Sequence, residues 1–120
     1  MSLLRRVLVG LAVGILFKIL FEVPASAQTR LSYSTDQAET GRQTYTRVCA
    51  ACHTATLQGS FEAPELAGPN FLNRWSGRAF NELLQYMRAT MPPSGQRLTN
   101  DQYTDIAAYL LQQNGFNVGA

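Results

Sequence analysis

Lysine is nearly absent from this chain of 120 residues, which contains it only as Lys18. Residues 28–120 contain no lysine, and their seven arginines balance seven acidic residues, so their formal charge is zero. Nucleic-acid binding needs a basic patch or stripe, and this composition does not provide one. A lysine-rich ring that would steer the protein onto an acidic partner is missing as well. We therefore expect no nucleic-acid ligand.

Histidine and cysteine are also scarce: His53 is the single histidine, and Cys49 and Cys52 are the two cysteines. Structural zinc needs four nitrogen or sulfur ligands, usually as two separated pairs, which three residues cannot provide. A thioredoxin-like dithiol would need a βαβ pattern around it, and the chain shows no strand–helix–strand alternation. A plain disulfide is an option in an oxidising compartment, but it would leave the histidine unexplained.

The three scarce residues stand together as Cys49-Ala50-Ala51-Cys52-His53. Cys-x-x-Cys-His is the attachment site of a c-type haem. Each thiol adds across one vinyl group of the porphyrin, and one turn of backbone between the thiols matches the separation of the vinyl groups. The adjacent imidazole then becomes the proximal ligand of the iron. We predict one covalent haem c, held by Cys49 and Cys52, with His53 on its iron.

The first 27 residues differ from the rest of the chain. Two arginines precede an apolar run at residues 7–21, and a small-x-small pattern ends at Ala27, as in secretory signals. We predict a signal peptide at residues 1–27, a flexible lead-in at 28–35 and one domain at 36–120. The apolar run is short for a membrane span and is interrupted by a lysine. An uncleaved anchor is the alternative, and we expect membrane attachment only in that case.

Capping patterns predict the first and last helices of the domain. Asp36-x-x-Glu39 reads as a capping box that opens a helix to about Val48. Thr99-x-x-Gln102 is a second capping box, which opens a helix with one apolar face (Tyr103, Ile106, Ala107, Leu110 and Leu111). Asn114-Gly115 then closes that helix with a left-handed cap.

The middle of the domain combines a helix with a long loop. Apolar residues at helical spacing predict a helix over Arg78–Thr90, which the following prolines end. Residues 54–77 are rich in glycine and proline and predict an irregular loop with at most a short turn of helix. So long a loop in a small domain indicates that it wraps something, and a porphyrin fits. No strand pairs are predicted, so the domain is all-α.

The second axial position on the iron needs a ligand other than histidine or lysine, because the domain has no further copy of either. Met87 and Met91 are the thioethers beyond the leader. Met87 lies on an apolar helix face, where methionine more often fills core space. Met91 ends its helix before two prolines that stiffen the loop, so we predict Met91 as the ligand. Met87 and a vacant sixth site are the alternatives. Histidine–methionine ligation favours one-electron transfer over oxygen chemistry.

Along the chain, the motifs run from a helix through Cys49–His53 and Pro64-Glu65-Leu66-Ala67-Gly68 to a helix, Met91 and a last helix. This order resembles the class I cytochromes c and covers residues 36–115. The resemblance implies a small all-α cytochrome c fold, in which the terminal helices cross and loops wrap around the haem. It also implies that Gly41 lies at the crossing with Tyr109 packed on it.

The resemblance implies further contacts with the haem. The carbonyl of Pro64 would accept a hydrogen bond from the proximal imidazole, with Pro69 as a weaker candidate and a purely loop-shaping proline as the alternative. Trp75 is similar to the tryptophan whose ring nitrogen meets a haem propionate, although a core aromatic would also need a partner. Arg74 and Arg78 are candidates to neutralise a propionate, with solvated arginines as the alternative.

A narrower likeness concerns residues 66–75, Met91-Pro92-Pro93 and residues 105–110, which look like the cytochrome domains that serve quinoprotein alcohol dehydrogenases. It implies a periplasmic carrier that takes electrons from a dehydrogenase and passes them to a terminal oxidase or another cytochrome. No residue is expected to be catalytic. The alternatives are a fixed subunit of a dehydrogenase complex and a haem-based ligand sensor or binder. A peroxidase would need a distal acid–base group that this chain does not offer.

Overall fold

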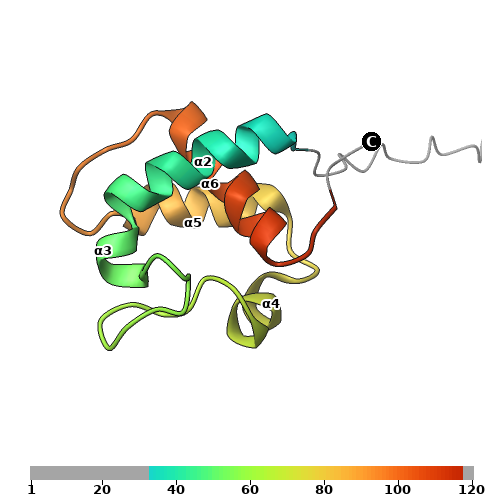
Figure 1. Ribbon diagram of the computed structural model, residues 1–120, viewed down its shortest axis with the longest axis horizontal. Helices are drawn as coiled ribbons and strands as arrows, with labels where there is room; N and C mark the ends of the chain where they lie inside the picture. Colours follow the sequence, from blue (N-terminus) through green and yellow to red (C-terminus); the bar gives the residue numbers. More distant parts are fainter. Residues whose placement is uncertain (1–32, 118–120) are drawn as a thin grey trace, which may run out of the picture. The chain divides into compact units, whose positions relative to one another are not determined.

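The computed structural model describes residues 33–117, so the predicted signal peptide at 1–27 and most of the lead-in lie outside the described residues. The described chain forms five helices and no strand (Figure 1), which confirms the all-α prediction: α2 (Thr35–Val48), α3 (Ala50–His53), α4 (Pro69–Trp75), α5 (Phe80–Thr90) and α6 (Asn100–Gln113). Among residues 33–117, no helix has the length and apolar character needed to cross a membrane.

The capping box of α2 differs from the prediction. Ser34, not Asp36, is the N-cap: the hydroxyl oxygen of Ser34 accepts from the backbone N–H of Gln37 at 3.1 Å. The side-chain oxygen of Gln37 in turn accepts from the backbone N–H of Ser34 at 3.4 Å. The predicted box between Asp36 and Glu39 is therefore wrong, and both residues lie inside the helix.

A buried tyrosine explains why the earlier cap is preferred. Tyr33 directly precedes the cap and packs in a small apolar cluster with Ala38, Ala108 and Leu111. Tyr33, just before the N-cap, and Ala38, in the second turn, occupy the two positions of the hydrophobic staple, which fixes how a chain enters a helix. The hydroxyl of Tyr33 also donates to the backbone oxygen of Phe116. The folded domain therefore includes Tyr33, which lies before the predicted boundary at residue 36.

Helices α2 and α6 cross with their backbones in contact, as predicted from Gly41. A Cβ atom on Gly41 would lie only 1.8 Å from the backbone oxygen of Asp105 in α6. One turn further along α6, the ring of Tyr109 packs against the ring of Tyr45 in α2, with centroids 5.4 Å apart. The predicted apolar face of α6 is buried in full. This crossing is one half of the core.

The other half of the core is formed by α5, α4 and the loop before α4. Helix α5 ends at Thr90 as predicted but begins at Phe80, two residues after the predicted start. The expected short turn of helix is α4, which has Pro69 in its first turn. In Figure 1 the loop from α3 to α4 runs below the three longer helices. Leu57 and Ala63 are the buried apolar side chains of this loop.

Candidate functional site

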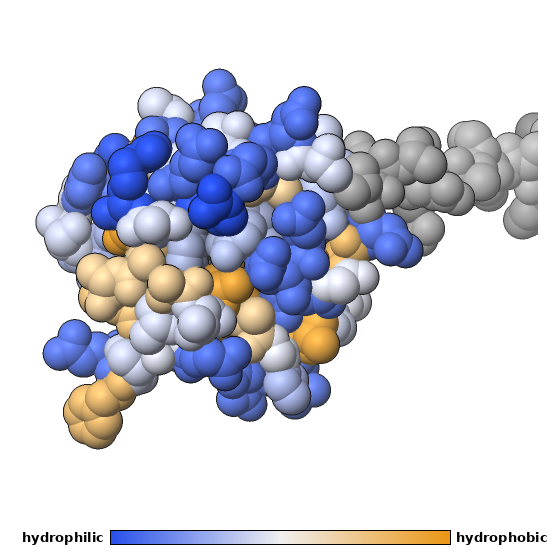
Figure 2. Space-filling model, viewed as in Figure 1, coloured by the Kyte–Doolittle hydropathy of each residue, from blue (hydrophilic) through white to orange (hydrophobic). Residues whose placement is uncertain are grey.

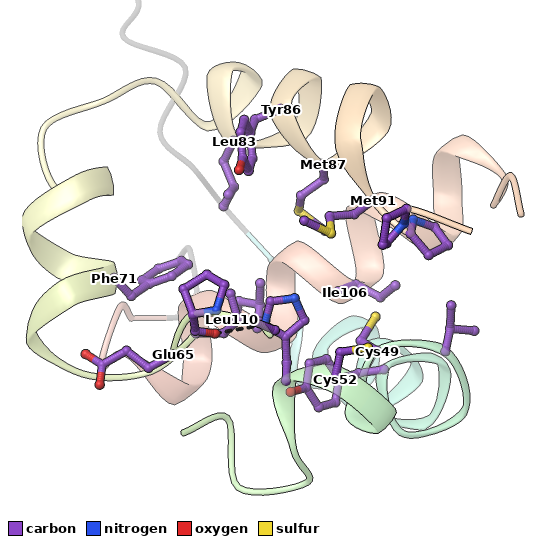
Figure 3. Close-up of a pocket in the computed structure, with 18 of the residues that line it drawn as sticks. Cys49, Cys52, Glu65, Phe71, Leu83, Tyr86, Met87, Met91, Ile106 and Leu110 are labelled. Carbon is purple, nitrogen blue, oxygen red and sulfur yellow. Dashed lines mark hydrogen bonds between the residues drawn. The ribbon is translucent and has the colours of Figure 1, made fainter. Parts of the chain in front are cut away.

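A cavity of about 540 Å³ lies inside the domain and receives side chains from every described helix. Its lining is predominantly apolar: Phe71, Leu83, Ile106 and Leu110 surround it together with the cysteines and methionines of the predicted site. Figure 3 shows Leu83 and Met87 of α5 facing Leu110 of α6 and the two cysteines across the cavity. Ligand pockets range from about 300 to 1,000 Å³, so the space suits a group of porphyrin size.

The short helix α3 places the two thiols. Cys49 lies between α2 and α3, and its backbone oxygen accepts from the N–H groups of Cys52 (3.2 Å) and His53 (3.0 Å). This single turn brings both cysteines to the cavity. The side chains differ in exposure, since Cys49 packs against the core and Cys52 is exposed. Burial raises the pKa of the Cys49 thiol to about 11, so the free thiol is protonated and weakly nucleophilic at neutral pH.

The imidazole of His53 is buried and held in one orientation. Its Nδ1 atom lies 2.8 Å from the backbone oxygen of Pro64. A carbonyl oxygen can only accept, so Nδ1 carries the donated proton, and in the neutral form of the ring Nε2 is then unprotonated. An unprotonated imidazole nitrogen is what a metal ion needs, and a hydrogen bond at the other nitrogen fixes the ring. The expected bond is thus made by Pro64 and not by Pro69.

The loop that carries Pro64 is folded back onto α3. The backbone N–H of Gly59 donates to the backbone oxygen of His53 at 3.0 Å. Gly59 has φ +73°, and a Cβ there would lie 2.5 Å from the oxygen of Ala63, so only glycine fits. The hydroxyl of Tyr45 donates to the backbone oxygen of Thr54 at 2.7 Å. These contacts fix the part of the loop between α3 and Pro64, whose carbonyl orients the imidazole.

Met91 and Met87 both line the cavity, and Figure 3 shows both thioethers pointing into it from the end of α5. Met91 is the C-cap of α5, where its backbone N–H donates to the oxygen of Met87 at 2.8 Å. Its own backbone oxygen accepts from the hydroxyl of Tyr103 at 2.7 Å. Sequence reasoning placed Tyr103 on an apolar face and missed this bond. The signal was available, because a buried tyrosine hydroxyl usually finds a partner.

Trp75 and Arg74 lie at the end of α4 and both line the cavity. The ring of Trp75 packs against Tyr86 with centroids 5.5 Å apart. The guanidinium of Arg74 lies 4.6 Å from the ring centroid of Tyr86. Arg78 stacks on the other aromatic, 5.6 Å from the Trp75 ring, and makes an exposed ion pair of 3.7 Å with Glu82. Of the two predicted arginines, Arg74 is thus the one that borders the cavity.

Asn114 is a structural residue that sequence reasoning treated only as a helix cap. Its side-chain NH₂ donates to the backbone oxygens of Leu66 (2.9 Å) and Leu110 (2.8 Å). Its side-chain oxygen accepts from the backbone N–H of Gly68 at 3.0 Å. The end of α6 is therefore hydrogen-bonded to residues 66–68, in the loop that precedes α4. Nothing in the sequence pattern connects residue 114 with residues 66–68.

The donor set and the cavity fit a covalently attached haem. Two thiols, an oriented imidazole and two thioethers all border one mainly apolar space. The apolar wall of the cavity would bury the apolar surface of the porphyrin. The nitrogen and sulfur ligands are those found in cytochromes. A bound haem c would be held by Cys49 and Cys52, with His53 on its iron.

Comparisons with known proteins agree with this geometry. The family described as cytochrome c oxidase, cbb3-type, subunit III matches residues 36–110. A cytochrome c6 from Diacronema lutheri is 30% identical over 78 residues, which cover 62% of this chain and 94% of that protein. No solved structure matches significantly. The chain therefore belongs to the class I cytochromes c, monohaem proteins with covalently bound haem c and iron that carry electrons between redox proteins.

Proposed function

We propose that this protein is a periplasmic one-electron carrier whose haem iron is bound by His53 and Met91. When bound, the haem supplies an iron that alternates between the ferric and ferrous states. The chain anchors the haem through Cys49 and Cys52 and keeps water away from it with the apolar wall. The observation that carries the proposal is that an oriented imidazole and the Met91 thioether border the same cavity.

Two hydrogen bonds support this ligand pair. The Pro64 carbonyl fixes the ring of His53, and the hydroxyl of Tyr103 fixes the backbone of Met91. Ligands that are held by the protein in both oxidation states need little rearrangement when an electron arrives. Histidine–methionine ligation also raises the reduction potential, because a soft sulfur ligand favours ferrous iron. Both features suit a carrier better than an enzyme, and we assign no catalytic residue.

The exposed thiol indicates where electrons would be exchanged. Cys52 is exposed, whereas Cys49 packs against the core. The haem edge bonded to Cys52 would therefore lie at the surface, and the opposite parts would be enclosed by α4, α5 and α6. Trp75 and Arg74 border the cavity at its α4 side, where they are suited to a haem propionate.

The partners that we propose are a dehydrogenase as donor and a terminal oxidase or another cytochrome as acceptor. The donor is supported by the likeness of residues 66–75 to cytochrome domains that serve quinoprotein alcohol dehydrogenases. The acceptor is supported by the family description, which names an oxidase subunit. That description also favours a second candidate, a cytochrome that stays fixed in a redox complex. Residues 1–27 would act as the export signal, and membrane attachment would follow only if they were retained.

Ligand spectroscopy on the haem-loaded protein tests the proposal. Oxidised cytochromes with sulfur ligation have a weak near-infrared absorption band, which we expect in the native protein. Met91→Ala should abolish the band and lower the reduction potential, whereas the matched variant Met87→Ala should keep the band. A band that persists in Met91→Ala would contradict the assignment. Rapid and complete binding of carbon monoxide to the reduced native protein would instead indicate a ligand sensor with a vacant site.

Mass spectrometry tests haem attachment and the N-terminus, and co-purification tests the mode of association. If the mass of one haem stays with the chain after the sample has been reduced, the haem is covalently attached. The N-terminal residue of the protein from a haem-maturing host would show whether residues 1–27 are removed. Co-purification with a dehydrogenase or oxidase at fixed stoichiometry would favour the fixed subunit over the diffusible carrier.

A further inference from the structure

Residues 91–98 form the loop from α5 to α6, and this loop begins with Met91, the methionine that we propose as an axial ligand. Both of its ends, Met91 and Leu98, line the cavity and are half-buried, whereas residues 93–97 are exposed. At the edge of the molecule where this loop lies in Figure 1, the surface in Figure 2 is hydrophilic to intermediate in hydropathy. Burial of apolar side chains therefore does little to hold the middle of the loop in place.

The sequence leaves the end of α5 short of hydrogen-bond donors. In an α-helix, the backbone oxygen of each residue accepts from the N–H group four positions later. The oxygen of Met87 has such a donor in the N–H of Met91, at 2.8 Å. The oxygens of Arg88 and Ala89 have none, because residues 92 and 93 are prolines and carry no N–H. A carbonyl at a helix end then needs a donor from outside the helix.

Arg97 supplies a donor from the far end of the loop. Its guanidinium Nη1 donates to the backbone oxygen of Arg88, in the last turn of α5, at 2.5 Å. A cation is also favoured at a helix C-terminus, where the peptide dipoles present their negative end. Within residues 33–117, this is the one hydrogen bond by which a side chain of residues 92–98 contacts the rest of the domain. The loop is therefore closed back onto the helix that ends at Met91.

The loop has few other restraints between its ends. The N–H of Gly95 donates to the oxygen of Pro92 at 3.2 Å, but this bond lies inside the loop. At the start of the loop, the hydroxyl of Tyr103 holds the backbone of Met91, as described above. Without the bond from Arg97, no hydrogen bond would join residues 92–97 to α5 in the described structure. Opening of the loop would then cost less, and Met91 would leave the cavity more often.

We infer that Arg97 is a positioning residue for Met91. It provides the donor that proline withholds from the end of α5, and it thereby keeps the loop closed and the thioether at the cavity. Arg97 does not itself line the cavity, so it acts through the loop and not by contact with the haem. This inference rests on the proposed function, because it takes Met91 as the axial ligand.

Imidazole binding to the oxidised, haem-loaded protein measures how often the loop opens. Imidazole can bind the iron only when the sulfur has left, and loss of the near-infrared band reports this exchange. The apparent dissociation constant of imidazole falls as the open form becomes more populated. Loss of a hydrogen bond from a charged donor shifts such an equilibrium by about five- to thirtyfold. Because Arg97 is exposed, we expect the lower end, a decrease of about fivefold in Arg97→Leu.

Two matched variants separate this role from a general loss of stability. Gln96→Leu changes the neighbouring exposed residue of the same loop and should leave the imidazole constant unchanged within about twofold. Ser34→Ala removes the N-cap of α2 and should lower the Tm, as Arg97→Leu does. It should nevertheless leave the imidazole constant unchanged within about twofold, because this cap belongs neither to the loop nor to α5.

The outcomes distinguish this inference from the proposed function. A native protein without the near-infrared band would have no sulfur ligand, which would overturn the proposed ligation and the inference together. If the band is present but Arg97→Leu binds imidazole no more tightly than Gln96→Leu, only the role of Arg97 is wrong. If Ser34→Ala binds imidazole as tightly as Arg97→Leu, the effect comes from lower overall stability, and the role of Arg97 is again wrong.

Discussion

Replacing Gly41 by alanine gives a sharp test of the crossing between α2 and α6. The added Cβ would lie 1.8 Å from the backbone oxygen of Asp105 and 2.9 Å from the backbone nitrogen of Ile106. Real Cβ atoms essentially never come closer than 3.0 Å to another atom, and a backbone oxygen in a helix cannot rotate away. The two helices must therefore separate along their contact.

The magnitude follows from two opposing effects. Overpacking a core costs about 1–3 kcal/mol, and we expect the upper end because the obstacle is backbone. Alanine is favoured over glycine in a helix by about 1 kcal/mol, which offsets part of the cost. Gly41→Ala should thus lower the free energy of unfolding by about 2 kcal/mol. For a domain of this size, that corresponds to a decrease in Tm of about 8–16 °C.

The assay is thermal and urea unfolding of the haem-loaded protein, followed by far-ultraviolet circular dichroism. Gln43→Ala is the matched control, because Gln43 is exposed on the same helix, and it should change stability by no more than about 0.5 kcal/mol. If Gly41→Ala is as stable as this control, the backbone contact between the two helices does not hold the domain together, and the reasoning fails.

Two tyrosine variants give the remaining predictions. Tyr103→Phe removes the hydrogen bond to the Met91 oxygen and should cost about 1 kcal/mol; in a urea titration, the near-infrared band should then disappear before the helical signal does, and simultaneous loss would show that this bond does not hold the ligand. Burial raises the pKa of Tyr45, so the folded state keeps a proton that the unfolded chain loses above about pH 10. Its contribution to stability is complete below that pH and is lost as the pH rises further. The free energy of unfolding should therefore fall above about pH 10, and less steeply in Tyr45→Phe. It is measured by urea unfolding at several pH values between about pH 9 and pH 11, and an equal decrease with pH in both proteins would contradict this.

Helix ends could be predicted from the sequence where neighbouring residues alone determine the cap. The reciprocal cap of Thr99 and Gln102 forms as predicted, and Gly115 has the expected positive φ of 79°. The start of α2 was misplaced because Ser34, Thr35 and Asp36 are three successive residues that can all cap a helix. Local patterns do not rank them, and the choice depends on Tyr33, whose burial against α6 is a tertiary contact.

The site was predictable to the extent that its motif is contiguous. Cys49, Cys52 and His53 are adjacent in sequence, and the bond from His53 to Pro64 spans only 11 residues. Longer connections leave no local pattern, as with the hydroxyl of Tyr103 on the Met91 backbone.

The three hydrogen bonds of Asn114 have a consequence for local opening of the domain. Fraying of the last turn of α6 removes the side chain that holds the backbone of Leu66 and Gly68. Amide hydrogens in that turn and in the loop should therefore exchange with solvent in a single cooperative unit rather than independently. The end of α6 thus sets how often the segment between His53 and α4 opens.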